Sequence, residues 1–339
     1  MLSNRFGGIG QAYLDYNEAL LLQGHTVQAI CHQNGGWKEH TEEQMKHSAK
    51  LSMVTVRQKG GLRVLPSLMK IRYHVKRFNP DIIVIHNYVR AGLLATKGLA
   101  PKVTITHMYK SQHFDEFAGV IALTNELEEM CLKDGISSDK LCVIPNMVSG
   151  PFYSPRRRPA GKTITIGGMG RLDPEKGFKN LIDAASLLKS NGMDFRLKIG
   201  GAGFIEEELR EQVRALDLTP FVEFCGFITD KKSFFETLDL FVIPSLEEPF
   251  GIIALESMKY GVPTITTTVG GLKSIFRSRK TALFVPPARP VELAGAIEEL
   301  IQDSDLAFEL AQNASNDLRQ KYSIDEISKQ LDAALHRWK

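Results

Sequence analysis

The chain of 339 residues is poor in cysteine and has no long hydrophobic run. No cysteine shares the paired spacing of a metal site, so we expect reduced, structural thiols at Cys31, Cys131, Cys142 and Cys225. No stretch approaches the roughly 20 apolar residues that a membrane-spanning helix needs, and the first residues lack the charged-then-apolar pattern of a secretory signal. The sequence therefore predicts a cytoplasmic protein.

Acidic residues are absent between Glu43 and Asp81, although the formal net charge of the whole chain is only +3. This segment, residues 44–80, carries the cations Lys46, Lys50, Arg57, Lys59, Arg63, Lys70, Arg72, Lys76 and Arg77. Apolar residues at helical spacing lie among them: Leu65, Leu68, Met69, Ile71 and Val75. Surface cations are most often simply solvated, but a basic helix with an apolar stripe also suits contact with an anionic surface. Both interpretations stay open.

Short β-rich segments alternate with longer helical patterns throughout the chain, which is typical of parallel βαβ units. In the first half we predict strands at 26–31, 52–56, 82–86, 103–107, 119–123 and 141–144, and helices at 11–23, 65–78 and 125–134. In the second half the predicted strands are 163–167, 196–199, 222–225, 240–243, 264–267 and 282–285, with helices between them.

The length and one break in this alternation indicate two domains. A single core usually stops growing near roughly 250–300 residues, and a Pro/Arg/Gly-rich stretch at 154–161 interrupts the pattern. We predict two Rossmann-like, doubly wound α/β domains facing a central cleft, spanning residues 1–155 and 160–321. A helix within 322–339 is expected to pack back toward the first domain. Only Met1–Phe6 precede the first glycine turn, so the opening strand is either very short or begins upstream of Met1.

Glycines precede the first predicted helix in Gly7-Gly8-Ile9-Gly10. They let backbone N–H groups approach an anion at the helix N-terminus, which makes Gly8 and Gly10 candidate contacts. A tight strand-to-helix turn explains the same pattern. The spacing is not the full dinucleotide fingerprint, and no acidic residue ends the next strand near Cys31, so a nicotinamide dehydrogenase is the least favoured class.

A second glycine-rich turn, residues 167–177, follows the first strand of the second half and contains two cations. Arg171 and Lys176 are separated by a proline-containing turn, so both heads could bind one diphosphate, Arg171 through forked N–H donors and Lys176 as a point charge. Two solvated loop cations are the alternative.

Two glutamates with the spacing Glu-x7-Glu follow a later strand. Glu248 lies in a loop, and Glu256 lies about one turn into the next helix, whose first N–H groups come from Phe250 to Ile252. Because that helix is apolar, an unpaired carboxylate at Glu256 would be costly, and a ligand hydroxyl suits it as a partner. A capping or solvated glutamate is the alternative.

In combination and order, these motifs resemble glycosyltransferase family four. The set is Gly-Gly-x-Gly, Gly-Arg-Leu-x-x-x-Lys-Gly, Gly200-Gly201-Ala202-Gly203, Phe224-Cys225-Gly226-Phe227, Pro-Ser-x-x-Glu-Pro-Phe-Gly, Glu-x7-Glu, Gly-x-Pro and Gly-Gly, from Gly7 to about Tyr322. The resemblance implies the GT-B fold and retaining transfer of a sugar from a nucleotide-diphosphate donor to a glycan or lipid-linked acceptor. The implied setting is cell-surface polysaccharide, lipopolysaccharide or glycolipid synthesis. In that setting, the basic and apolar pattern of residues 44–80 suggests a peripheral contact with an anionic membrane at its inner face. No nucleic-acid partner is expected.

The resemblance also implies roles. It assigns the two cations to the donor diphosphate, the second glutamate to the ribose hydroxyls, the first glutamate and the backbone after it to the transferred sugar, and the loop after strand 222–225 to the nucleobase. The catalytic residues it implies are Arg171, Lys176, Glu248 and His107. The donor-binding residues it implies are Gly8, Gly10, Phe227, Ile228, Phe250, Gly251, Ile252 and Glu256. His86, at the end of another predicted strand, competes with His107, which is expected near the sugar and acceptor.

No metal or other cofactor is expected. Metal-dependent sugar transfer would use an Asp-x-Asp motif at a strand end, whereas Asp303-Ser304-Asp305 falls between two helical patterns and is predicted to be a helix cap. Two rival functions stay open: a nucleotide-sugar epimerase of the same architecture, and a nucleotide-sugar-binding protein without turnover.

Overall fold

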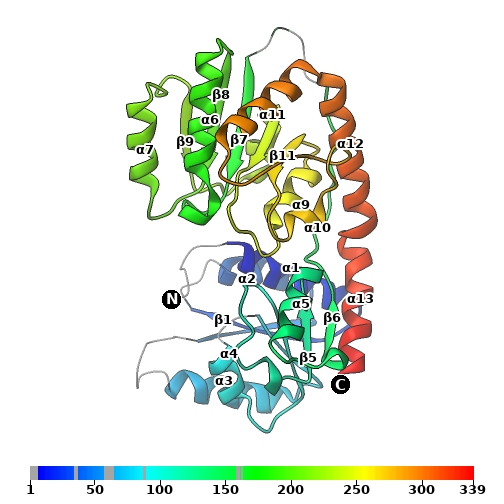
Figure 1. Ribbon diagram of the computed structural model, residues 1–339. Coiled ribbons are helices and arrows are strands. Elements are labelled where there is room, and N and C mark those ends of the chain that lie inside the picture. Colours follow the sequence, from blue (N-terminus) through cyan, green and yellow to red (C-terminus); the bar gives the residue numbers. More distant parts are fainter. Residues whose placement is uncertain (1–6, 34–36, 57–64, 87–88, 158–160, 162) are drawn as a thin grey trace. The chain divides into compact units, whose positions relative to one another are not determined.

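The structure is a computed structural model that describes residues 7–33, 37–56, 65–86, 89–157, 161 and 163–339 (Figure 1). The chain forms two compact units, and each is described by itself. Unit 1 comprises Met1–Ser149 and Tyr322–Lys339, and unit 2 comprises Gly150–Lys321. The prediction about the opening strand at Met1–Phe6 lies outside the described residues.

Unit 1 has helices around two parallel sheets. Its helices are α1 (Gly8–Leu22), α2 (Trp37–His47), α3 (Leu65–Phe78), α4 (Val89–Ala95), α5 (Asn125–Lys133) and α13 (Ile324–Arg337), with 3-10 turns η2 (Phe114–Glu116) and η3 (Ser138–Lys140). One sheet pairs β1 (Val27–His32) with β2 (Leu51–Val56). The other has the order β3 (Ile83–Ile85), β4 (Lys102–Ile105), β5 (Gly119–Ala122) and β6 (Leu141–Val143).

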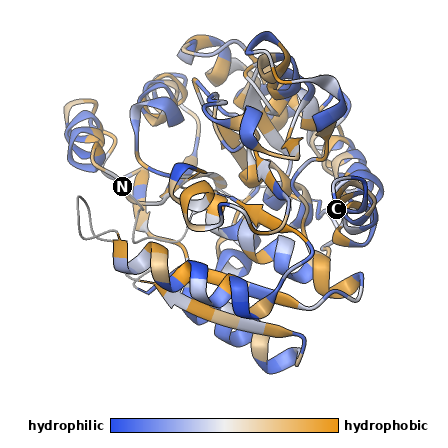
Figure 2. Ribbon diagram, turned by 90° about the horizontal axis from the view of Figure 1, so that it is seen from below, coloured by the Kyte–Doolittle hydropathy of each residue, from blue (hydrophilic) through white to orange (hydrophobic). Residues whose placement is uncertain are grey.

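Apolar side chains explain why these segments pack as they do. Every residue of β5 is buried, and in Figure 2 the strands are largely hydrophobic while the helices mix hydrophobic and hydrophilic faces. Thr124 caps α5 by accepting a hydrogen bond from the Leu127 N–H at 3.2 Å. Helix α13 packs against α1, and Trp338 covers Gly119 so closely that a Cβ at Gly119 would lie 2.1 Å from the indole.

Unit 2 is built on six parallel strands in the order β12-β11-β10-β7-β8-β9. The strands are β7 (Ile164–Met169), β8 (Phe195–Gly200), β9 (Val222–Gly226), β10 (Leu240–Ile243), β11 (Thr264–Thr267) and β12 (Leu283–Val285). The helices are α6 (Phe178–Ser190), α7 (Glu206–Ala215), α8 (Lys231–Glu236), α9 (Ile252–Lys259), α10 (Leu272–Ile275), α11 (Pro290–Gln302) and α12 (Ser304–Lys321), with the 3-10 turn η4 (Pro174–Lys176).

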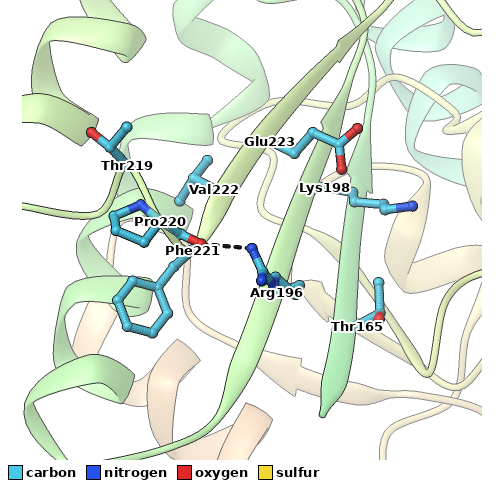
Figure 3. Close-up of a pocket in the computed structure, with 8 residues that line it drawn as sticks. All are labelled: Thr165, Arg196, Lys198, Thr219, Pro220, Phe221, Val222 and Glu223. Carbon is cyan, nitrogen blue, oxygen red and sulfur yellow. Dashed lines mark hydrogen bonds between the residues drawn. The ribbon is translucent and has the colours of Figure 1, made fainter.

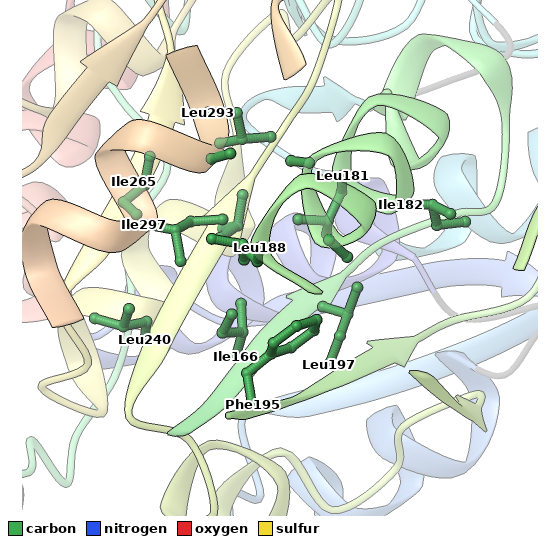
Figure 4. Packing of buried hydrophobic residues seen from close by; sticks show 14 of the residues in the cluster. Ile166, Leu181, Ile182, Leu188, Phe195, Leu197, Leu240, Ile265, Leu293 and Ile297 are labelled. Atoms are coloured by element: carbon green, nitrogen blue, oxygen red, sulfur yellow. The ribbon is translucent and has the colours of Figure 1, made fainter. Parts of the chain in front are cut away.

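The main core of unit 2 lies between its sheet and two of these helices. Leu181 and Leu188 of α6 and Ile297 of α11 meet Ile166 and Leu197 of the sheet (Figure 4). At about 25 cal/mol per Å² of buried apolar surface, such layers give an α/β unit most of its stability. This packing fixes the ends of the strands, and therefore the points from which the loops that follow them begin.

Two predictions about local structure are confirmed, for the cysteines and for the cap of α12. The cysteines are free, and Asp303 caps α12 by accepting a hydrogen bond from the Leu306 N–H at 2.8 Å. None of the helices in the described residues is long and apolar enough to cross a membrane.

Two predictions about helices need correction. Helix α1 begins at Gly8 rather than Gln11, so Gly8 and Gly10 form its first turn, with Gly7 as the N-cap. The apolar stripe predicted on α3 is not one continuous surface. Val75 is buried and Ile71 is half-buried, whereas Met69 is exposed. Helical spacing alone does not decide which apolar face meets the core.

Candidate functional site

The strand order of unit 2 reverses between β7 and β10. In open parallel sheets, ligands bind in a crevice outside the carboxyl ends of the two strands that flank such a reversal. The loop after β7 carries Arg171 and Lys176, and the loop after β10 carries Glu248. Leu246 N–H donates to the Glu175 carbonyl at 2.7 Å, which joins the two loops.

Gly177 sets how closely these loops approach. Its φ of 69° lies in the left-handed region, and a Cβ there would stand 1.9 Å from the Pro244 carbonyl oxygen. Only glycine fits this contact without movement of the backbone. The contact brings Lys176, the preceding residue, beside the loop after β10.

Lys176 and Glu248 form an ion pair across the crevice. The distance from Lys176 Nζ to Glu248 Oε2 is 2.6 Å, and the carboxylate also accepts a hydrogen bond from Ser245 Oγ at 3.4 Å. Glu248 is only 7% exposed, so its charge needs this partner. The structure thus brings together two residues that the sequence motifs placed 72 positions apart.

Arg171 has different partners. It pairs with Asp173, and its Nη2 lies 3.8 Å from Glu175 Oε2, while 61% of the side chain is exposed. The structure therefore places both predicted cations on loops of the same crevice, each held by its own carboxylates.

Glu256 lies in α9, and its carboxylate pairs with a residue that the motifs do not reveal. Its Oε1 forms an ion pair with Lys231 Nζ, and the glutamate is 8% exposed. The sequence suggested a ligand hydroxyl as the partner of this carboxylate; within the chain, the carboxylate is paired with a lysine from α8. No motif could identify Lys231, because its position follows from packing between α8 and α9.

The backbone between the two glutamates is fixed by close contacts. Phe250 is buried, and Gly251 has a φ of 99° where α9 begins at Ile252. A Cβ on Gly271 would lie 2.4 Å from the Phe250 carbonyl oxygen, and the Gly271 N–H donates to the Glu248 carbonyl at 2.9 Å. The later Gly-Gly motif therefore supports the glutamate loop.

Phe227 and Ile228 follow β9 and differ in environment. Ile228 packs over Gly200, where a Cβ would lie 2.7 Å from Ile228 Cγ1. Phe227 is 48% exposed and offers an aromatic surface at the same edge of the sheet.

In unit 1, His86 and His107 follow β3 and β4 instead of ending them. His86 Nδ1 lies 3.3 Å from His107 Nε2, and the rings stack with centroids 5.5 Å apart. Tyr16 meets the His86 ring edge-on at 4.7 Å, and no described group is hydrogen-bonded to its buried hydroxyl. The two candidates for one role are thus in direct contact.

Both imidazoles are neutral at pH 7. Burial lowers the pKa of His107 to about 4, and burial together with the neighbouring His107 holds the pKa of His86 well below its usual range. A single N–H···N hydrogen bond between neutral rings needs one donor and one acceptor, so each ring constrains the tautomer of the other. At neutral pH this pair can orient a hydroxyl but adds no positive charge.

A separate pocket in unit 2, of about 450 Å³, lies toward the amino ends of the strands (Figure 3). Arg196 and Lys198 of β8 line it together with Glu223 of β9, and Arg196 donates to the Pro220 carbonyl at 2.8 Å. It contains none of the predicted site residues. Within the described part of the chain, no group of three or more His, Cys, Asp or Glu residues is placed to hold a metal ion.

Two α/β units, one of them with the Rossmann strand order, are the architecture of the GT-B class. A solved structure of Anabaena HepE shares this fold with a TM-score of 0.84 and 21% identity, over 98% of this chain and 97% of that one. Residues 6–149 match the family model described as Glycosyltransferase Family 4, and residues 152–317 match Glycosyl transferases group 1. The chain belongs to glycosyltransferase family 4, as its motifs indicate.

Two curated relatives show how far the similarity extends. An uncharacterized glycosyltransferase of Methanocaldococcus jannaschii is 33% identical over 164 residues, which is 48% of this chain and 42% of that protein. The lipopolysaccharide core biosynthesis glycosyltransferase LpsE of Rhizobium meliloti is 25% identical over 333 residues, or 95% of this chain and 94% of that protein. The first similarity thus covers less than half of each protein, and the second covers nearly all of both.

Proposed function

We propose that this protein transfers a sugar, with retention of configuration and without a metal ion, from a nucleotide-diphosphate sugar to a glycan or lipid-linked acceptor in the cytoplasm. The observation that carries this proposal is the Lys176–Glu248 ion pair across the β7/β10 crevice, with Glu256 in the helix that follows. A ligand that carries both phosphate and hydroxyl groups is bound best by cations and carboxylates that lie close together, as these do.

The site offers complementary groups for each part of such a donor. A diphosphate arriving at Lys176 and Arg171 competes with their carboxylates for the cations, which releases oxygens of Glu248 to accept hydrogen bonds from the sugar. Negative charge grows on the diphosphate as the bond to the sugar breaks, and cations already held in place stabilise it. Glu256 would accept from the ribose hydroxyls.

The remaining predicted residues would complete donor and acceptor binding. The backbone from Phe250 to Ile252 would hold the sugar, and the exposed ring of Phe227 beside Ile228 would contact the base. The first turn of α1, at Gly8 and Gly10, would offer N–H groups to an anion. His107 would orient a hydroxyl of sugar or acceptor as a neutral imidazole.

Relatives suggest the donor and the setting. HepE was crystallised in complex with UDP-glucose, and LpsE is named for lipopolysaccharide core biosynthesis. We therefore propose a UDP-sugar as the first donor to test, and a cell-surface polysaccharide, lipopolysaccharide or glycolipid as the product.

The test is an incubation of the protein with UDP-, GDP- and ADP-sugars, with and without an extract of bacterial lipids and glycans. The proposal predicts sugar transfer that needs the extract, persists in EDTA, and is lost in E248Q. A new epimer formed from the donor alone would support the epimerase, and donor binding without any product would support a binding protein.

Helix α3 supports a membrane contact as a finer part of this proposal. Leu65, Met69 and Tyr73 are spaced four residues apart on one face and are 55%, 71% and 60% exposed. The cations Lys76 and Arg77 lie exposed on the same helix. By contrast, Lys70 donates to the Thr55 carbonyl and Arg72 to the Lys97 carbonyl, both at 2.7 Å. These two cations therefore hold α3 against the rest of unit 1. Arg57, Lys59 and Arg63 lie outside the described residues.

Vesicle co-sedimentation tests this contact with two separate variants. Each cation near an anionic leaflet contributes about 1 kcal/mol, so K76Q/R77Q should weaken salt-sensitive binding to anionic vesicles, and L65S/M69S/Y73S should weaken it further. V291S, at a residue of α11 that is 67% exposed, is the control. Equal sedimentation of all these proteins would exclude α3 as a membrane contact.

A further inference from the structure

Lys231 is the first residue of α8, and its charged head meets the carboxylate expected to bind ribose. The side chain of Glu256 is 10% exposed and that of Lys231 is 27% exposed, so the pair is largely shielded from water. A carboxylate in such surroundings needs a cation or several hydrogen bonds to stay charged. Lys231 is the cation that the structure supplies.

The two elements that carry this pair are locked together. Phe235 of α8 is fully buried and stacks on Tyr260, just after α9, with ring centroids 4.8 Å apart and planes 13° apart. The Tyr260 N–H donates to the Glu256 carbonyl at 3.0 Å. At the other end, Asp230 caps α8 by accepting from the Ser233 N–H at 3.0 Å. The side chains of Lys231 and Glu256 therefore both extend from backbone that these contacts hold in place.

The adjacent lysine has different surroundings. Lys232 lies 3.8 Å from Glu236 and 5.6 Å from the centre of the Tyr153 ring, and its side chain is 53% exposed. The two lysines share a helix and a charge but not a contact with Glu256. Lys232 therefore provides a matched control.

We propose that Lys231 is a positioning residue of the donor site, which holds the Glu256 carboxylate in the orientation that accepts the ribose hydroxyls. This inference rests on the proposed function and extends it to a residue outside the family motifs. Lys231 binds Oε1, and no other described residue is hydrogen-bonded to this carboxylate, so Oε2 and the second lone pair of Oε1 can accept from hydroxyl donors.

Two consequences follow for nucleotide binding. A glutamate already fixed in one rotamer loses little side-chain freedom when the ribose arrives, so the affinity for a ribonucleotide rises. Because Lys231 acts through Glu256, its effect should appear only with nucleotides that carry the ribose hydroxyls. A lysine that merely supported the fold would affect all nucleotides alike.

Calorimetric titration with UDP and with 2′,3′-dideoxy-UDP tests the inference. The proteins are wild type, K231M, K231R, the control K232M, E256Q and the double variant K231M/E256Q. If wild type prefers GDP or ADP, the corresponding pair of nucleotides replaces these two. Circular dichroism melting checks that each variant folds, and K231Q replaces K231M if the latter does not.

We expect K231M to lower the affinity for UDP about tenfold, the effect of one lost charge-assisted contact, and to leave dideoxy-UDP within about twofold of wild type. K231R should retain most of the affinity, K232M all of it, and K231M should add little to E256Q. Unchanged UDP affinity in K231M, equal losses for both nucleotides, or additive losses in the double variant would overturn the inference while the proposed function stands. A wild-type protein that binds no nucleoside diphosphate would overturn both.

Discussion

Acid should destabilise unit 1 through the pair of histidines, His86 and His107, that follow β3 and β4. All nine histidines of the chain lie in the residue ranges of unit 1, and unit 2 has none. The folded unit keeps His107 neutral down to a pKa of about 4, whereas an unfolded histidine takes up a proton near pH 6.5. Between these values the unfolded state binds more protons, so stability falls as the pH falls.

The magnitude follows from the same two values. The depressed pKa of His107 corresponds to about 3 kcal/mol of stability that is fully present above pH 6.5 and is lost by about pH 4. The pKa of His86 is depressed for the same reason, so it acts in the same direction. Tyr13 and Tyr16 are the other titratable groups whose rings meet this pair, and burial raises the pKa of both hydroxyls, so they stay neutral throughout.

Tryptophan fluorescence isolates the effect, because the two tryptophans, Trp37 and Trp338, both belong to unit 1. Urea unfolding followed by this signal at pH 7.5, 6, 5 and 4 gives the stability of unit 1 at each pH. H107Q should flatten the profile by about 3 kcal/mol relative to wild type, whereas H113Q, at a loop histidine that is 46% exposed, should not. Parallel profiles for wild type and H107Q would refute the argument that burial keeps this imidazole neutral.

Two further predictions concern the crevice of unit 2. R171A and K176A should each lower turnover on the order of 100-fold, with a smaller effect on donor binding, because leaving-group charge grows toward the transition state; small, simply additive losses in the double variant would show that the cations do not share one diphosphate. G177A should weaken donor binding and lower the melting temperature, since its Cβ would stand 1.9 Å from the Pro244 carbonyl oxygen. The control G192A has a φ of 72° and no atom within 4 Å of the added Cβ, so it should lower the free energy of unfolding only by the backbone strain of about 1 kcal/mol. Comparable losses in these two glycine variants would argue against the steric contact.

The sequence predicts strands well where burial is uniform. The bounds predicted for β10 and β11 are those observed, because every residue of these strands is buried and turn residues flank them. Helix α1 was predicted to start three residues late, since glycine has a low helix propensity and the glycine pattern at residues 7–10 suits a turn as well as a helix. On α3, periodicity identified a helix but not the side that meets the core.

The residues of the candidate site also differ in whether the sequence could identify them. Lys176 and Glu248 could be identified from motifs, because glycine turns and the Glu-x7-Glu spacing mark the loops that carry them. Lys231 could not, because its contact with Glu256 depends on the stacking of Phe235 on Tyr260. Likewise, the sequence offered His86 and His107 as alternatives for one role, whereas in the structure His86 Nδ1 lies 3.3 Å from His107 Nε2.

Differential scanning calorimetry with UDP, GDP, ADP and their sugars tests the central claim that unit 2 holds a nucleotide-diphosphate donor. Unit 2 lacks tryptophan, so calorimetry detects its melting where fluorescence cannot. A ligand at about 100 times its dissociation constant stabilises the folded state by about 2.7 kcal/mol. We predict that at least one of these nucleotides raises the melting temperature of wild type and raises it less in E256Q. If none of them shifts the melting of the wild-type protein, the proposed donor site is wrong.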